Sequence, residues 1–244
     1  MCRHLAYVGS PVLLRELVAD PEFGLVRQSW APRRQHHGVL NADGFGVGWY
    51  VEGFDEPARH RAAVPIWADE TFADLSRVIR STAFLAAVRS ATIGMSPGQA
   101  AAAPFRSGRW LFSHNGAIDG WPDAAGRLAW GLDPGVLART EAPTDSVLLW
   151  ALTVDLLRRG KSAEAALAEV ITRAVDTGGG RLGFLLTDGR QIAATAWDVS
   201  LCWRQLPGGV VVASEPYDDD PSWIDVPDRH VLVADANGVS VEPL

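Results

Sequence analysis

The chain has 244 residues, of which 48% are hydrophobic and 21% charged, the composition of an ordinary globular protein with enough apolar residues for a core. The formal net charge of −7 argues against nucleic acid as the main partner, and no stretch is long and apolar enough to cross a bilayer. Two cysteines, Cys2 and Cys202, do not suggest a disulfide framework, and the N-terminus lacks the long apolar segment of a signal peptide, so a cytoplasmic location is expected.

The first predicted element is a short strand from Arg3 to Val8 that carries Cys2 at its tip. Cys2 becomes the N-terminal residue if Met1 is removed, which its small side chain allows. It then carries a thiol and, on the same residue, an α-amine that titrates near about 8 and can accept the thiol proton. A nucleophile with its own base is a recognised arrangement for covalent catalysis. For these two residues alone, a buried cysteine without a catalytic role is the commoner alternative.

Helical and extended patterns then follow in an order typical of stacked sheets covered by helices. In chain order, the predicted elements are a strand over 3–8, a helix over 11–20, a strand over 45–49, a helix over 69–79, strands over 84–89 and 110–114, helices over 144–160 and 163–175, and strands over 182–186, 191–197, 201–205, 210–214, 231–234 and 239–242. Strands, then helices, then strands again favour one domain over residues 1–244.

Local signals set several of these boundaries. Ser10-Pro11 combines a cap with proline at the first helical position, which predicts that a helix begins there. Thr144 and Ser162 are helix caps, each followed by an apolar face. Asn115-Gly116 is a turn-forming pair, which predicts that the strand over 110–114 ends at residue 114.

Four groups of residues could carry chemistry beside Cys2. They are Arg89 with Thr92, His114 with Asn115 and Gly116, Asp145, and the glycines of the stretch 44–48. Each also has an ordinary structural explanation, such as a paired charge for Arg89 or a favourable helix N-terminal charge for Asp145. The glycines lack the strand-then-helix context of a phosphate loop. No spacing of Cys, His or acidic residues resembles a zinc or iron site.

Taken together and in this order, these residues closely resemble the motifs of the class II glutamine amidotransferase-like family of N-terminal nucleophile hydrolases. The resemblance covers nearly the whole chain. It implies an α+β fold, an αββα sandwich with the nucleophile on the first strand, and an enzyme that needs no metal ion or cofactor.

The resemblance also implies a role for each motif. Cys2 matches the nucleophile, which attacks the δ-carbonyl of a γ-glutamyl group. Arg89 and Thr92 match the segment that holds the substrate's α-carboxylate, and Asp145 matches the acidic site that holds its α-amine. His114-Asn115-Gly116 matches the oxyanion-hole signature, in which the Asn115 side-chain amide and the Gly116 N–H donate to the developing oxyanion. His114 is grouped with the substrate-binding residues.

Three other stretches resemble one branch of the family, which hydrolyses γ-glutamyl-hercynylcysteine S-oxide in ergothioneine biosynthesis. They are residues 25–32, 41–50 and 213–221. This resemblance implies release of glutamate and hercynylcysteine S-oxide. The trimethylammonium group of hercynine cannot donate hydrogen bonds, so aromatic faces suit it. Trp30, which lies beside a polar loop, is predicted to line its pocket with His37 or Phe105 nearby.

Two other functions stay open at this point. One is a glutaminase that supplies ammonia to a separate synthase, although the chain has no synthase domain or nucleotide-binding motif of its own. The other is a non-catalytic sensor or binding protein on the same fold, against which intact Cys2, Arg89, Asn115 and Asp145 argue. The expected partner is a small γ-glutamyl molecule, with no nucleic acid and no membrane. The oligomeric state is open, a homodimer being one option, and so is the removal of Met1.

Overall fold

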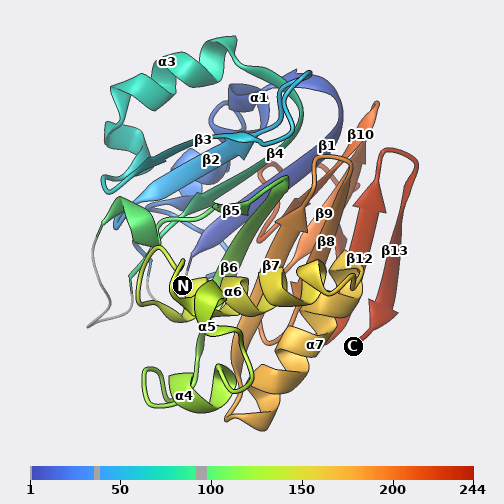
Figure 1. The fold of residues 1–244 in the computed structure, drawn as a ribbon. Coiled ribbons are helices and arrows are strands. Elements are labelled where there is room, and N and C mark those ends of the chain that lie inside the picture. Colours follow the sequence, from blue (N-terminus) through green and yellow to red (C-terminus); the bar gives the residue numbers. More distant parts are fainter. Residues whose placement is uncertain (1, 36–38, 92–97) are drawn as a thin grey trace.

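The computed structural model describes residues 2–35, 39–91 and 98–244 (Figure 1). Two antiparallel sheets lie face to face, and helices cover both outer sides. The αββα sandwich implied by the family resemblance is therefore confirmed. Among the described residues, no helix combines the length and apolar character needed to cross a membrane.

The sheets differ in size and in the helices that cover them. The seven-stranded sheet has the order β11 (Ile224–Asp225), β9 (Cys202–Leu206), β10 (Gly209–Ala213), β1 (Arg3–Leu13), β4 (Arg80–Val88), β2 (Phe45–Trp49) and β3 (Ala58–Ala62). The six-stranded sheet has the order β13 (Gly238–Pro243), β12 (His230–Asp235), β8 (Gln191–Ala196), β7 (Gly180–Thr187), β6 (Trp110–Ile118) and β5 (Phe105–Ser107). The first sheet carries α1 (Leu14–Val18), α2 (Leu25–Gln28), η1 (Ile66–Ala68) and α3 (Glu70–Val78), and the second carries η2 (Gln99–Ala101), α4 (Ala125–Leu128), α5 (Pro134–Leu137), α6 (Asp145–Arg158) and α7 (Ala163–Asp176).

The direction of each side chain on β1 and β6 follows from strand alternation. On β1, Ala6 and Val8 are buried between the sheets, whereas Leu5 and Tyr7 pack under α1 to α3. His4 therefore points into the space between the sheets, and Arg3 points to the opposite side. On β6, Leu111 lies between the sheets and Phe112 packs against α6. Ser113 and Asn115 consequently point towards β1.

Two predicted boundaries are wrong because strand pairing overrides the local signals. Ser10-Pro11 does not begin a helix: β1 continues through a bulge after Val8, pairs again with β4, and α1 begins at Leu14. Asn115-Gly116 does not end the strand over 110–114, because Asn115 pairs with Gly183 and Gly116 with Leu182 of β7. The helix starts predicted from caps are confirmed, with α6 beginning after Thr144 and α7 after Ser162.

Candidate active site

A pocket lies where the ends of β1, β4 and β6 meet the start of α6. The residues around it include Cys2, Arg89, Ser113, His114, Gly116 and Ser146, with Phe105 closing one side. The space between these atoms is about 490 Å³, part of it open to solvent. The structure thus brings four of the predicted site residues, Cys2, Arg89, His114 and Gly116, together around one cavity.

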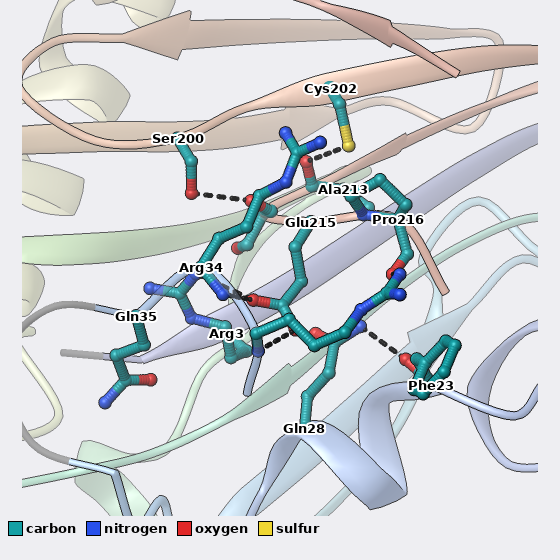
Figure 2. Close-up of polar contacts among 12 residues, drawn as sticks. Arg3, Phe23, Gln28, Arg34, Gln35, Ser200, Cys202, Ala213, Glu215 and Pro216 are labelled. Carbon is teal, nitrogen blue, oxygen red and sulfur yellow. Dashed lines mark hydrogen bonds and ion pairs between the residues drawn. The ribbon is translucent and has the colours of Figure 1, made fainter. Parts of the chain in front are cut away.

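The two cysteines lie in contrasting surroundings. Cys2 precedes β1, is only partly buried, and has its Sγ 4.0 Å from the carbonyl oxygen of Ser90. Cys202 is fully buried on β9 and donates to the carbonyl of Ala213 at 3.4 Å (Figure 2). Burial raises the pKa of the Cys202 thiol, which keeps it protonated and unreactive. Only Cys2 therefore presents a thiol to the pocket.

Arg89 follows the last residue of β4 and is almost completely buried. Its backbone N–H donates to Gly44 at 2.8 Å, and its Nη1 donates to the Asp43 carbonyl at 3.3 Å. The carboxylate of Asp43 accepts the N–H of Ala91 at 2.8 Å, which fixes the chain beyond Arg89. The carbonyl of Asp43 thus holds the guanidinium, and that of Gly44 holds the backbone of Arg89. Thr92, predicted to act with Arg89, lies outside the described residues.

Asn115 and Gly116 lie side by side on β6. Asn115 is fully buried, and neither its Nδ2 nor its Oδ1 has a hydrogen-bond partner among the described residues. An unsatisfied buried amide costs about 1–3 kcal/mol, and such groups call for a functional explanation. At Gly116, φ is 150° and an added Cβ would lie 1.7 Å from the carbonyl oxygen of Arg181, so no other residue fits.

His114 faces α6 from β6 and makes two hydrogen bonds. Its Nε2 lies 3.0 Å from the Arg181 carbonyl, which can only accept, so this nitrogen carries the hydrogen. Its Nδ1, 3.0 Å from the Ser146 hydroxyl, then accepts from it. Burial lowers the pKa of His114, in keeping with a neutral ring. The two nitrogens therefore join β6 to the start of α6 and to β7.

Asp145 is the first residue of α6 and is almost completely buried. One carboxylate oxygen accepts the N–H of Ile118 at 3.1 Å, and the other accepts the N–H of Ser146 at 2.7 Å. Its position at a helix N-terminus stabilises the negative charge. Its neighbours Thr144 and Ser146 line the pocket.

Trp30, predicted to contact the leaving group, is not among the residues lining the pocket. Trp30 packs edge-on against Trp67, with ring centroids 5.4 Å apart, and the guanidinium of Arg27 lies 5.5 Å from the Trp30 ring. His37 lies outside the described residues. Phe105, by contrast, does line the pocket.

The sequence analysis missed a polar contact between the sheets. Nδ1 of His4 lies 3.0 Å from the hydroxyl of Ser113, and both residues are buried. Each lies two positions from a predicted catalytic residue, His4 from Cys2 and Ser113 from Asn115, so on each strand the pair shares a face. Burial, and then the charge of Arg3, lowers the pKa of His4 well below its ordinary value. A neutral histidine thus links β1, which follows Cys2, to β6, which carries Asn115 and Gly116.

No cluster of three or more Cys, His, Asp or Glu side chains suited to a metal ion occurs within residues 2–35, 39–91 and 98–244. The family model described as glutamine amidotransferases class-II matches residues 13–211. The chain belongs to the class II glutamine amidotransferase family.

Relatives within this family align along the full length of the chain. A gamma-glutamyl-hercynylcysteine sulfoxide hydrolase of Mycolicibacterium smegmatis is 46% identical over 250 residues, covering 100% of both chains. A protein of the same name from Mycobacterium tuberculosis is 42% identical over 246 residues, covering 100% of this chain and 97% of its own. The solved structure of a glutamine aminotransferase class-II domain protein from Silicibacter pomeroyi superposes with a TM-score of 0.74 at 23% identity, covering 100% of this chain and 99% of that one. The likeness to this solved structure establishes the fold of the chain and no more.

Proposed function

We propose that this chain hydrolyses the γ-glutamyl amide bond of γ-glutamyl-hercynylcysteine S-oxide and releases glutamate and hercynylcysteine S-oxide. The observation that carries this proposal is the 46% identity to a hydrolase of that name over the full length of both chains. The pocket supports it, because a nucleophile, a guanidinium and an unpaired amide lie around or beside one cavity.

The reaction begins with the N-terminal residue of the mature chain. The α-amine of Cys2 takes the thiol proton, and the thiolate attacks the δ-carbonyl carbon of the γ-glutamyl group. The amide Nδ2 of Asn115 and the backbone N–H of Gly116 donate to the resulting oxyanion. Loss of one such donor typically costs about 100–1,000-fold in rate. The unpaired state of the Asn115 side chain is what this role requires before substrate arrives.

Collapse of the tetrahedral intermediate breaks the carbon–nitrogen bond. The protonated α-amine of Cys2 gives its proton to the leaving nitrogen, and the glutamyl group stays on the sulfur as a thioester. Water, deprotonated by the same amine, then attacks the thioester carbon, and glutamate leaves as the thiol is restored.

The glutamyl end of the substrate carries an α-carboxylate and an α-ammonium. Arg89 binds the carboxylate through its guanidinium, and Asp145 binds the ammonium. Ser146 and His114 hold Asp145 and the oxyanion strand in register, through the hydrogen bonds at the start of α6.

Intact-protein mass spectrometry with rapid quenching tests the proposal. The expected result is a chain that lacks Met1 and, with γ-glutamyl-hercynylcysteine S-oxide, gains the mass of one glutamyl group on Cys2 before glutamate is released. Turnover of glutamine with release of ammonia, and none of the hercynyl substrate, would instead establish a glutaminase. If neither substrate forms an adduct or is turned over, the chain is a binding protein and not an enzyme.

A further inference from the structure

We propose that Glu215 and Arg3 are a buried positioning pair that fixes the orientation of Cys2, an inference that rests on the proposed role of Cys2 as nucleophile. Figure 2 shows Arg3, Arg34 and Glu215 gathered beside the end of β10. Nη1 of Arg3 lies 3.6 Å from Oε2 of Glu215, and the exposed fractions of the two side chains are 1% and 0%. Nε of Arg3 donates to the carbonyl of Cys2 at 2.9 Å.

Cys2 needs an anchor of this kind because it lies outside the sheet, one residue before the first paired residue of β1. The pairing of β1 with β4 begins at Arg3, opposite Val88, and the ladder between β1 and β10 begins at Leu5. Once Met1 is removed, no residue precedes Cys2, so rotation about its Cα–C bond moves both the thiol and the amine. The hydrogen bond from Arg3 holds the Cys2 carbonyl and so fixes the peptide plane that places the Cys2 Cα, the atom from which both the thiol and the amine project.

Glu215 in turn fixes Arg3 and a second segment of the chain. Its two oxygens accept the backbone N–H groups of Arg33 at 2.9 Å and Arg34 at 2.8 Å. The preceding residue, Ser214, makes three hydrogen bonds with the backbone of His4, two of 3.0 Å and one of 3.3 Å. One carboxylate therefore ties the loop after α2 to the strand that carries the nucleophile.

Stability alone is a poor explanation for this arrangement. The desolvation of a buried ion pair often exceeds its Coulombic gain, and apolar replacements of similar volume are often equally stable or better. Nη1 of Arg3 has no hydrogen-bond partner among the described residues, so the pair is incompletely satisfied. Glu215 lies within 213–221 and the loop directly follows 25–32, and the proposed chemistry uses neither Glu215 nor the backbone of this loop in any other way. Positioning gives both the charge pair and these stretches a purpose.

Glu215→Gln tests the pair because it keeps the size of the side chain and removes its charge. The matched control is Asp225→Asn, which removes an exposed ion pair from Arg34 of the same loop. We expect Glu215→Gln to lower kcat by about 10–100-fold, the cost of a small misplacement of reacting groups, with KM changed less than about twofold. Alkylation of Cys2 by iodoacetamide, followed by peptide mass spectrometry, should change in rate for Glu215→Gln and not for Asp225→Asn.

A double-mutant cycle separates positioning from simple loss of structure. Arg3→Met and Arg3→Met/Glu215→Gln should have the same kcat within about twofold, because Glu215 acts on Cys2 only through Arg3. Independent, multiplying losses would overturn the proposal, and so would wild-type kcat and alkylation rate in Glu215→Gln. If Glu215→Gln lowers the melting temperature, the comparison is repeated with Glu215→Asp, which keeps the charge and should restore part of kcat.

The outcome is independent of which substrate the enzyme uses. If the wild-type chain hydrolyses glutamine and not the hercynyl compound, the proposed substrate fails, and kcat on glutamine still reports on the pair. If no γ-glutamyl compound is hydrolysed, the alkylation rate of Cys2 alone decides whether Glu215 and Arg3 orient it.

Discussion

Single residues differ in reactivity here because of where the sheets place them. Cys2 stands at a strand end beside a cavity, whereas Cys202 lies inside β9 with its thiol bonded to Ala213. Cys2→Ala should therefore abolish turnover, while substrate binding persists. Steady-state kinetics and calorimetric titration measure the two effects separately.

Cys202→Ala is the matched control for this experiment. It should leave kcat unchanged and affect at most the free energy of unfolding, because the Cys202 thiol is buried away from the pocket. Substantial turnover by Cys2→Ala would mean that another group attacks the substrate.

A further prediction at the residue scale is that Trp30 binds the leaving group of the substrate. A trimethylammonium over an aromatic face gains about 0.5–2 kcal/mol, roughly a few-fold to thirty-fold in affinity. Trp30 is 37% exposed and packs edge-on against Trp67, and the guanidinium of Arg27 lies over one face of its ring, so the prediction concerns the opposite face. Trp30→Ala should raise KM for the hercynyl substrate by that factor and leave KM for a γ-glutamyl amide without the trimethylammonium nearly unchanged.

The exposed Trp130 gives the control, since Trp130→Ala removes an indole from a distant surface of the six-stranded side. Equal losses on both substrates in Trp30→Ala would show that Trp30 supports the structure and does not recognise the leaving group.

At the scale of the element, β6 depends on a glycine in a conformation that other residues avoid. Gly116→Ala would place a Cβ against the Arg181 carbonyl at a φ of 150°. Strain and overpacking of this kind each cost about 1–3 kcal/mol. We expect a loss of about 2–4 kcal/mol in the free energy of unfolding, measured by urea denaturation.

Gly126→Ala provides the comparison within α4. An added Cβ there meets nothing within 4 Å, and alanine favours the helix by about 0.5–1 kcal/mol. Similar stabilities for the two variants would mean that β6 can shift to accept a side chain at position 116.

Elements with strong local signals could be predicted from the sequence, and the pairing between them could not. The caps at Thr144 and Ser162 begin helices where expected, because a capping side chain satisfies backbone groups only a few residues away. The Asn115-Gly116 pair was misjudged as a turn, since its extended conformation depends on β7, more than sixty residues later in the chain.

The candidate site likewise has features that the sequence predicts and features that it does not. Motif residues could be located one by one, whereas the contacts of His4 with Ser113 and of Arg3 with Glu215 join positions distant in sequence. Alternation alone does not give the register between the two sheets, on which the contact of His4 with Ser113 depends. It also does not give the pairing of β1 with β10, which brings Glu215 to Arg3.

For the whole molecule, the two buried neutral histidines make stability depend on pH. Burial lowers the pKa of His4 and of His114. In the unfolded chain both titrate near about 6.5, so below that pH the unfolded state binds more protons and stability falls as pH falls. Between pH 7 and 5.5, protonation of the unfolded chain at His4 should lower the free energy of unfolding by about 1 kcal/mol, and protonation at His114 by up to the same amount.

Urea denaturation at the two pH values measures this loss. His4→Gln keeps a polar group near Ser113 and removes one of the two titrations, so it should reduce the pH dependence by about half. Equal stability of the wild-type protein at both pH values would contradict the assignment of neutral histidines.

Strand β1 becomes a central strand of its sheet only when β10 exists, because Leu5 to Gly9 pair with residues 209–213. A ribosome adds about 5–20 residues per second, so residue 215 emerges about 10–40 s after residue 2. During that interval the N-terminus has no β10 beside it and no Glu215 for Arg3. Removal of Met1, which the proposed mechanism requires, would therefore act on an open chain end, and the thiol of Cys2 would become part of a finished pocket only after β10 is made. In the proposed mechanism, the fold thus separates in time the exposure of the Cys2 amine from its use.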